Sequence, residues 1–184
     1  MTRTGDNQLK RRTITLAMSA LILVACGGSD ESVDADVMFA QMMIPHHEQA
    51  IELADIALDP TVEAGDEVKT LAAAIKAAQD PEVEMMTTML QSWGESLFLD
   101  EGMDHSSMMS GMVSSDDMDE LETLRGPEFD TAWLKAMIAH HEGAIDMAND
   151  VIEDGDDVDT AELARKIIDG QAVEIETMKG LLGE

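Results

Sequence analysis

Apolar and polar residues recur along most of the chain with the period of an α-helix. Within residues 36–58 the apolar side chains stand three and four positions apart, as Phe39, Met43 and Ala50 do, and polar residues take the opposite face. Such spacing places one apolar stripe along a helix. Residues 66–93, 130–153 and 159–182 follow the same rule, and no segment shows the sustained alternation of a strand. The pattern predicts four principal helices.

The four predicted helices form two similar pairs. Residues 36–54 and 130–148 are identical at nine of nineteen positions, at an offset of 94 residues. At an offset of 92 residues eight more positions match, and these are Leu71, Ala72, Ile75, Gln79, Glu82, Glu84, Met86 and Leu90 with Leu163, Ala164, Ile167, Gln171, Glu174, Glu176, Met178 and Leu182. Duplication of a helix hairpin explains both matches.

Four amphipathic helices bury their apolar stripes best as a bundle. We therefore expect an all-α four-helix bundle over residues 36–184, built from two duplicated helix hairpins. Copy one spans residues 36–93 and copy two spans residues 129–184. Residues 94–128 form a Gly/Ser/Met/Asp-rich linker, with a short helix near residues 116–124.

The first 25 residues have the pattern of a bacterial export signal. Three basic residues at positions 10–12 precede an apolar run that is too short to span a membrane. The run ends with Leu23-Val-Ala-Cys26, which resembles the box at which bacterial lipoproteins are cleaved and lipidated. We expect residues 1–25 to be removed, Cys26 to be lipidated, and residues 26–35 to be a flexible tether. An ordinary signal peptide that ends near a cysteine is the alternative.

The expected mature chain, residues 26–184, is strongly acidic. It holds 7 of the 11 Lys and Arg and 38 of the 39 Asp and Glu, which gives a net charge of 7 − 38 = −31. Such a surface repels nucleic acid and anionic membranes and attracts cations. Nucleic-acid binding is thereby excluded, and membrane contact is expected through the lipid anchor only. Cys26 is the only cysteine, so no intramolecular disulfide can form.

Two adjacent histidines lie on the apolar stripe of the first helix of each copy. At 100° per residue, His46 and His47 flank the centre of the stripe, with Met43 between them. Copy two repeats this arrangement with His140, His141 and Met137. Paired imidazoles that face a core are candidate metal ligands.

The second helix of each copy carries a glutamate in its apolar stripe. Glu82 lies between Ile75 and Met86, with Gln79 at the edge of the stripe. The corresponding residues of copy two are Glu174, Ile167, Met178 and Gln171. A carboxylate in a core is costly unless it is paired or binds a metal. We therefore expect the histidines, glutamates, glutamines and methionines to face one core, either as a metal site or as a structural His–Glu network.

The linker holds a second candidate site. Within residues 102–112 it contains one histidine and four methionines, which are His105, Met103, Met108, Met109 and Met112. Thioethers suit Cu(I), and imidazole together with thioether ligands favours copper over zinc or iron. A loop packed over the bundle, with methionine as filler, is the alternative.

These motifs resemble a bacterial family called domain of unknown function 305. The resemblance rests on residues 43–54, 137–148 and 79–86 and on the Met/His linker, and it covers nearly all of residues 35–184. It implies a ferritin-like helical fold, an extracytoplasmic location and, from some members, copper binding and copper tolerance. Carried over by position, the four core histidines are the expected functional residues and the linker methionines are their helpers.

The favoured function is that of a lipid-anchored, extracytoplasmic protein that sequesters or delivers copper. Two alternatives are a metal-free interaction protein of the envelope and a ferritin-like dinuclear metal oxidase. Oxidase sites of that kind use Glu-x-x-His motifs on the bundle helices, and the core positions here contain none. No fingerprint of an organic cofactor is present either. A binding protein is therefore favoured over an enzyme.

Overall fold

The computed structural model describes residues 1–2, 31–97 and 109–184, with side chains described from residue 35 within the first helix. These parts of the chain form α-helices and one short 3-10 turn, without a strand. The elements are α1 (Glu31–Leu58), η1 (Pro60–Val62), α2 (Asp66–Trp93), α3 (Ser115–Thr123), α4 (Gly126–Asp154) and α5 (Val158–Leu182). The predicted all-α fold is confirmed. Among the described helices, none carries an apolar stretch long enough to cross a membrane.

Two of the helices begin earlier than the sequence predicts. α1 starts at Glu31, inside the stretch 26–35 that was predicted to be a tether, because no Gly or Pro interrupts the chain between Glu31 and Ile44. α4 starts at Gly126 because Pro127 fits the first turn of a helix, where its missing N–H is not needed. The predicted cleavage site and Cys26 lie outside the described residues.

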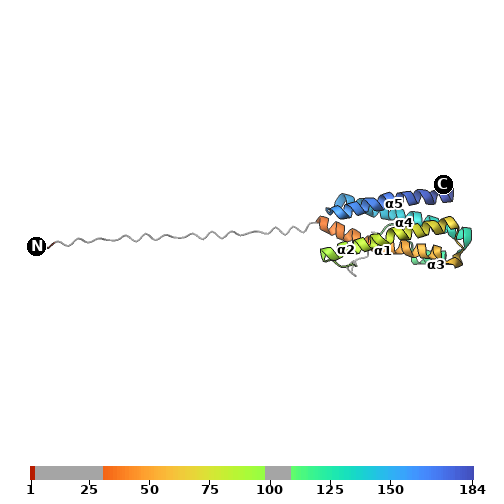
Figure 1. The fold of residues 1–184 in the computed structure, drawn as a ribbon, viewed down its shortest axis with the longest axis horizontal. Helices are drawn as coiled ribbons and strands as arrows, with labels where there is room; N and C mark the ends of the chain where they lie inside the picture. The colour runs from red at the N-terminus through yellow and green to blue at the C-terminus, as the bar shows by residue number, and fades with distance from the viewer. Residues whose placement is uncertain (3–30, 98–108) are drawn as a thin grey trace.

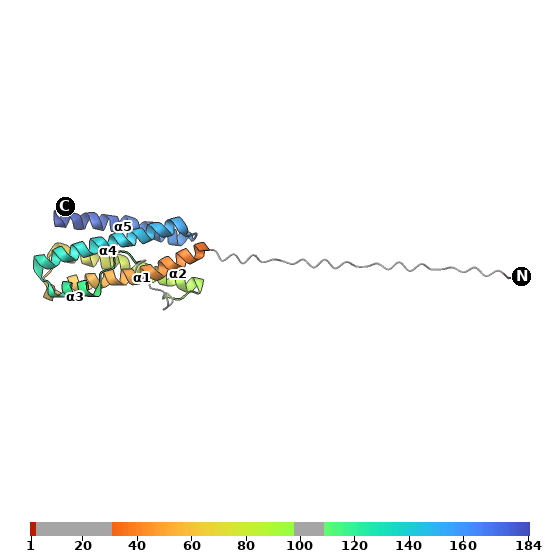
Figure 2. The ribbon, with the colours of Figure 1, turned by 180° about the vertical axis from the view of Figure 1, so that it is seen from behind.

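The four long helices lie side by side as a bundle, with α3 beside one end of it (Figure 1). α1 packs closely against α2 and α4, and α4 packs against α5, whereas α2 and α5 make few contacts. α1 and α4 are therefore the central pair of the bundle. The view from behind shows α5 along one edge of the bundle, next to α4 (Figure 2).

Two apolar clusters fill the bundle, one in each half of its length. The first cluster is drawn from residues 50–57 of α1, 68–75 of α2, 129–137 of α4 and 175–178 of α5. The second cluster is drawn from residues 39–44, 86–90, 144–151 and 163–167 of the same helices. Because the start of α1 packs with the end of α4, these two helices run antiparallel. Residues 45–49 and 138–143 therefore meet near the middle of the bundle.

A duplicated aspartate ties each copy to the hairpin turn of the other. Asp36 Oδ2 accepts hydrogen bonds from the backbone N–H groups of Asp156 (3.0 Å) and Asp157 (2.9 Å). Its counterpart Asp130 accepts from the N–H of Gly65 through Oδ1 at 3.0 Å and through Oδ2 at 3.2 Å. A Cβ at position 65 would lie 2.8 Å from Asp130 Oδ2, so glycine lets the carboxylate approach. These reciprocal bonds join the two hairpins into one bundle.

Candidate metal centre

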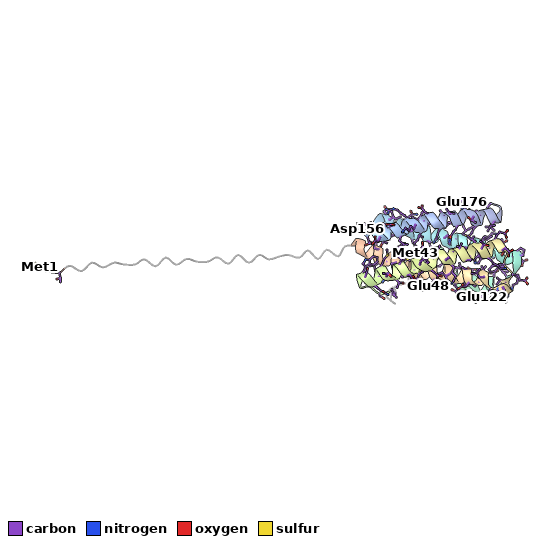
Figure 3. All side chains as sticks on the ribbon, viewed as in Figure 1. Met1, Met43, Glu48, Glu122, Asp156 and Glu176 are labelled. Atoms are coloured by element: carbon purple, nitrogen blue, oxygen red, sulfur yellow. The ribbon has the colours of Figure 1, made fainter. Side chains whose placement is uncertain are left out.

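The four histidines of the duplicated motif form one buried polar layer between the two apolar clusters. His46 and His47 on α1 and His140 and His141 on α4 are each 0% exposed. The helical wheel predicts this burial for all four. The neighbouring Glu48 is exposed and Met43 is buried, and both are labelled near the middle of the bundle in Figure 3.

The inner histidines of the two copies, His46 and His140, meet face to face across the bundle. Their ring centroids are 3.8 Å apart and the rings are tilted by 40°. Burial lowers the pKa of His46 to about 4, and burial together with the neighbouring imidazoles lowers the pKa of His140 well below 6.5. Both rings are therefore neutral at pH 7, which is the protonation state that binds metal ions.

The outer histidines, His47 and His141, each bond to the glutamate of their own copy. His47 Nε2 lies 3.0 Å from Glu82 Oε2, and His141 Nε2 lies 2.7 Å from Glu174 Oε2. A carboxylate only accepts, so Nε2 carries a proton and points at the glutamate. Metal-binding histidines have this arrangement, because a carboxylate behind the ring fixes the tautomer.

The two glutamates are less buried than the sequence predicts. The side chains of Glu82 and Glu174 are 21% and 19% exposed. α2 and α5 make few contacts with each other, so the edges of their apolar stripes stay near solvent. The two glutamines, Gln79 and Gln171, are the deeper residues at 2% and 4% exposure. The glutamates thus stand behind the outer histidines at the rim of the layer.

The polar layer contains many buried atoms without a hydrogen-bond partner. Within the described residues these are Nδ1 of His46, His47 and His141, both ring nitrogens of His140, and the side-chain amides of Gln79 and Gln171. Each such atom costs about 1–3 kcal/mol when it is buried without a partner. Unpartnered imidazole nitrogens concentrated in one layer fit a group that accepts their lone pairs, as a metal ion does.

The core methionines flank the histidine layer from both sides. Met43 and Met86 belong to the second cluster, Met137 and Met178 belong to the first, and all four are 0% exposed. Across the described parts of the chain, no group of three or more His, Cys, Asp or Glu is arranged to hold a metal ion. A site on the inner pair of histidines would draw further ligands from the methionine sulfurs or from the unpartnered amide oxygens of Gln79 and Gln171. Such a set suits a soft ion of low coordination number.

The end of the linker reaches the histidine layer. His46 Nε2 donates to the backbone carbonyl of Ser110 at 3.1 Å. Met109 and Met112, on either side of this contact, are partly buried, and Met109 packs against the second cluster. The other predicted linker ligands, Met103, His105 and Met108, lie outside the described residues. The sequence analysis did not identify Ser110 as a partner of His46. The available signal was that copy two has Gly143 where copy one has Gln49.

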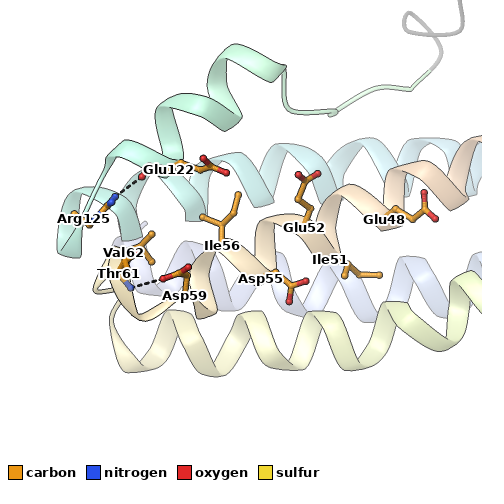
Figure 4. A pocket seen from close by; sticks show the side chains of 10 residues that line it. All are labelled: Glu48, Ile51, Glu52, Asp55, Ile56, Asp59, Thr61, Val62, Glu122 and Arg125. Carbon is orange, nitrogen blue, oxygen red and sulfur yellow. Dashed lines mark hydrogen bonds between the residues drawn. The ribbon is translucent and has the colours of Figure 1, made fainter.

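A separate acidic groove of about 690 Å³ lies between α1 and α3, away from the histidines. Its rim carries five carboxylates and one arginine, which are Glu48, Glu52, Asp55, Asp59, Glu122 and Arg125 (Figure 4). The Arg125 guanidinium donates to the backbone carbonyls of Glu122 and Leu124. The carboxylates raise the local cation concentration at the surface.

Comparison with known proteins finds a matching family and several similar solved structures. A family model described as "Domain of unknown function (DUF305)" matches residues 36–182. A DUF305 protein from Streptomyces coelicolor, described as a secreted protein, has 32% identity and a TM-score of 0.75 over 81% of this chain and 92% of its own. A DUF305 fragment from Deinococcus radiodurans has 34% identity and a TM-score of 0.72 over 81% and 95%. No protein with a curated function matches the chain.

A third similar structure contains metal. CopM in its Cu(II)-bound form has 30% identity and a TM-score of 0.66, over 79% of this chain and 94% of CopM. CopM is also solved in a Cu(I)-bound form and in silver-bound forms, at comparable similarity.

Proposed function

The chain belongs to the DUF305 family, and on this premise we propose that it is a metal-binding protein that sequesters or delivers copper through its buried histidine layer. CopM, which is similar over most of this chain, has been solved with Cu(I), Cu(II) and Ag. Silver(I) resembles Cu(I) in its preference for soft ligands, so this set of ions supports a soft site.

One observation carries the proposal. His46 and His140 are neutral, fully buried and 3.8 Å apart between ring centroids, and their Nδ1 atoms have no partner. These two rings would hold the metal, and the neighbouring core methionines would supply thioethers. His47 and His141 would orient and enclose the site with Glu82 and Glu174 behind them. The bound ion supplies a positive charge that takes up the otherwise unused lone pairs of the layer.

A lipid anchor on Cys26 would place this site outside the cytoplasm. The box Leu23–Cys26 after a short apolar run supports the anchor, and the similar Streptomyces protein is described as secreted. Replacing Cys26 with Ala should release the protein from the membrane or leave its precursor uncleaved. Normal processing with unchanged membrane retention would contradict the anchor.

Copper titration of the mature chain without its lipidated cysteine, residues 27–184, tests the core site. The double variant His46→Ala/His140→Ala should lose about one bound copper, measured by competition with a Cu(I) chelator under anaerobic conditions. The control replaces Met103 and Met108, which lie outside the described residues, with Ile and leaves Met109 and Met112 in place; it should retain that copper. An unchanged copper count in the histidine variant would refute the core site and leave the linker as the candidate.

The same titration separates the two alternative functions. If the layer is a structural network in a metal-free interaction protein, the histidine variant loses stability while wild type binds no copper. A ferritin-like oxidase would require iron or manganese held by several carboxylates, and only Glu82 and Glu174 stand at the layer in the described structure. Metal analysis after growth with copper, zinc and iron decides among the three.

A further inference from the structure

A short strap from the end of the linker, residues 109–113, crosses the histidine layer between α1 and α4. Its Ser110 carbonyl accepts the hydrogen bond from His46 Nε2 at 3.1 Å. Its other end is fastened to α1, because Gln49 Nε2 donates to the Val113 carbonyl at 2.9 Å and Val113 N–H donates to Gln49 Oε1 at 2.8 Å. A side-chain amide that bonds both ways with one backbone unit holds that unit in place much as a neighbouring strand would.

Two glycines let the strap lie directly on α4. A Cβ on Gly143 would overlap the Ser110 carbonyl oxygen and carbon. A Cβ on Gly111 would overlap the backbone oxygen of Ala139, and Gly111 has φ +82°, a conformation that other residues rarely adopt. The backbone of the strap and the backbone of α4 therefore touch with no side chain between them.

The strap lies where the internal repeat is broken. Gln49 and Gly143 occupy equivalent positions three residues after His46 and His140. In copy one the side chain holds the strap, and in copy two the missing side chain leaves room for it. Neither ring nitrogen of His140, the equivalent of His46, has a hydrogen-bond partner of ordinary geometry in the described structure, although an interaction with the backbone of His46 raises its pKa against the larger effect of burial. The two inner histidines therefore differ because of the strap.

We propose that the strap is a positioning element of the metal site, which keeps the proton of His46 on Nε2 and so presents Nδ1 of His46 to the metal. A carbonyl oxygen cannot donate, so the Ser110 bond selects one tautomer. Gln49, Gly111 and Gly143 are then positioning residues that act through Ser110. The effect of the strap on metal binding rests on the proposed function, whereas the fixed tautomer of His46 does not.

The test compares Gly143→Ala with Gly170→Ala in the mature chain. Both changes add one methyl group to a helix and raise its propensity by about 1 kcal/mol, but a Cβ at Gly170 meets nothing within 4 Å. Imidazole ¹⁵N shifts of the metal-free protein report the tautomer of His46. Gly143→Ala should turn one fixed tautomer into a mixture and weaken Cu(I) binding about tenfold or more, and Gly170→Ala should do neither.

A second variant keeps the proposal testable if Gly143→Ala does not fold. Gln49→Ala releases Val113 without adding an atom at α4, and Gln91→Ala, on the exposed face of α2, is its control. Gln49→Ala should speed amide exchange at Val113, mix the His46 tautomers and weaken copper binding. The proposal that the strap positions the metal site is contradicted if the His46 proton stays on Nε2 in both Gly143→Ala and Gln49→Ala, or if the copper affinity is unchanged in both. A wild-type chain that binds no copper contradicts the proposed function instead, and the ¹⁵N shifts still decide the tautomer.

Discussion

Copy one and copy two place their outer histidines in matching surroundings and their inner histidines in different ones. His47 bonds to Glu82 and His141 bonds to Glu174, in both cases through Nε2 and across the hairpin of the same copy. The ring of His46, in contrast, bonds to the linker, whereas the ring of His140 has no hydrogen bond of ordinary geometry and interacts only weakly with the backbone of His46 in the described structure. Contacts within one hairpin follow the repeat, and contacts with the linker cannot, because there is only one linker.

The difference shows how a duplicated fold acquires an asymmetric site. The repeat supplies two neutral rings that pack against each other near the middle of the bundle. One change, Gln49 against Gly143, then lets a single strap approach from one side. A metal held by this pair would therefore meet one ring whose tautomer the strap fixes and one ring that the strap does not hold.

The largest effect is expected at the aromatic pair Phe39 and Trp133, which are equivalent in the repeat. Both are buried, Phe39 in the second cluster and Trp133 in the first, and only Trp133 adds a hydrogen bond, from its indole N–H to the Leu53 carbonyl at 2.8 Å. Replacing either with Ala should lower the free energy of unfolding by about 3–5 kcal/mol. Trp133→Phe should cost about 1–2 kcal/mol beyond the lost volume. Urea unfolding of the three variants measures this, and equal stability of Trp133→Phe and wild type would contradict it.

Local periodicity was sufficient to predict the helices and the burial of the histidines. The bounds of α2, residues 66–93, agree with prediction, because its apolar stripe starts and stops with the helix. The wheel placed His46 and His141 in the core without any knowledge of the partner helix. The exposure of Glu82 was not predictable in this way, since it depends on how far α2 stands from α5.

Contacts between distant segments escaped the sequence analysis. The pairing of His46 with His140 depends on where α1 crosses α4, and no helical wheel contains that information. The bond from His46 to Ser110 joins residues 64 positions apart. Gly143 was visible as a departure from the repeat, yet its meaning came only with the strap that lies on it.

The pH dependence of stability tests the inner pair. The pKa of His46 is lowered from 6.5 to about 4 by burial, so between these values the unfolded chain binds a proton that the folded chain does not. The contribution of His46 to the free energy of unfolding is therefore complete above pH 6.5 and decreases as the pH falls toward 4. At 1.36 kcal/mol per pKa unit the total decrease is about 3 kcal/mol. Urea unfolding of the metal-free protein at pH 7.5 and 4.5 measures the loss. His46→Gln should show a smaller loss, and an identical pH dependence in both proteins would contradict the assignment.

Asp36 and Asp130 should contribute about equally to the free energy of unfolding, and less than the buried aromatic residues do. Asp36→Ala and Asp130→Ala each remove a carboxylate that accepts backbone N–H groups of the opposite hairpin turn. Hydrogen bonds to a charged group contribute about 1.5–3 kcal/mol, so each variant should be destabilised by about 2 kcal/mol. Hydrogen exchange should rise at Asp156 and Asp157 in the first variant and at Gly65 in the second. Faster exchange at both turns in either variant would show that the hydrogen bonds of Asp36 and those of Asp130 are not independent.

The smallest expected difference lies between Glu82→Gln and Glu174→Gln. An amide is a weaker acceptor than a carboxylate and does not fix the tautomer of the histidine, so each change should weaken copper binding about tenfold. Because the His47–Glu82 and His141–Glu174 contacts are alike in geometry and exposure, the two variants should agree within about twofold, the scatter expected of equivalent contacts. Anaerobic Cu(I) competition measures both, with Glu84→Gln, on the exposed face of α2, as control. A large effect of one variant alone would mean that the outer pairs are inequivalent as well, through the strap or through Pro45 and Pro81, which are Ala139 and Val173 in copy two.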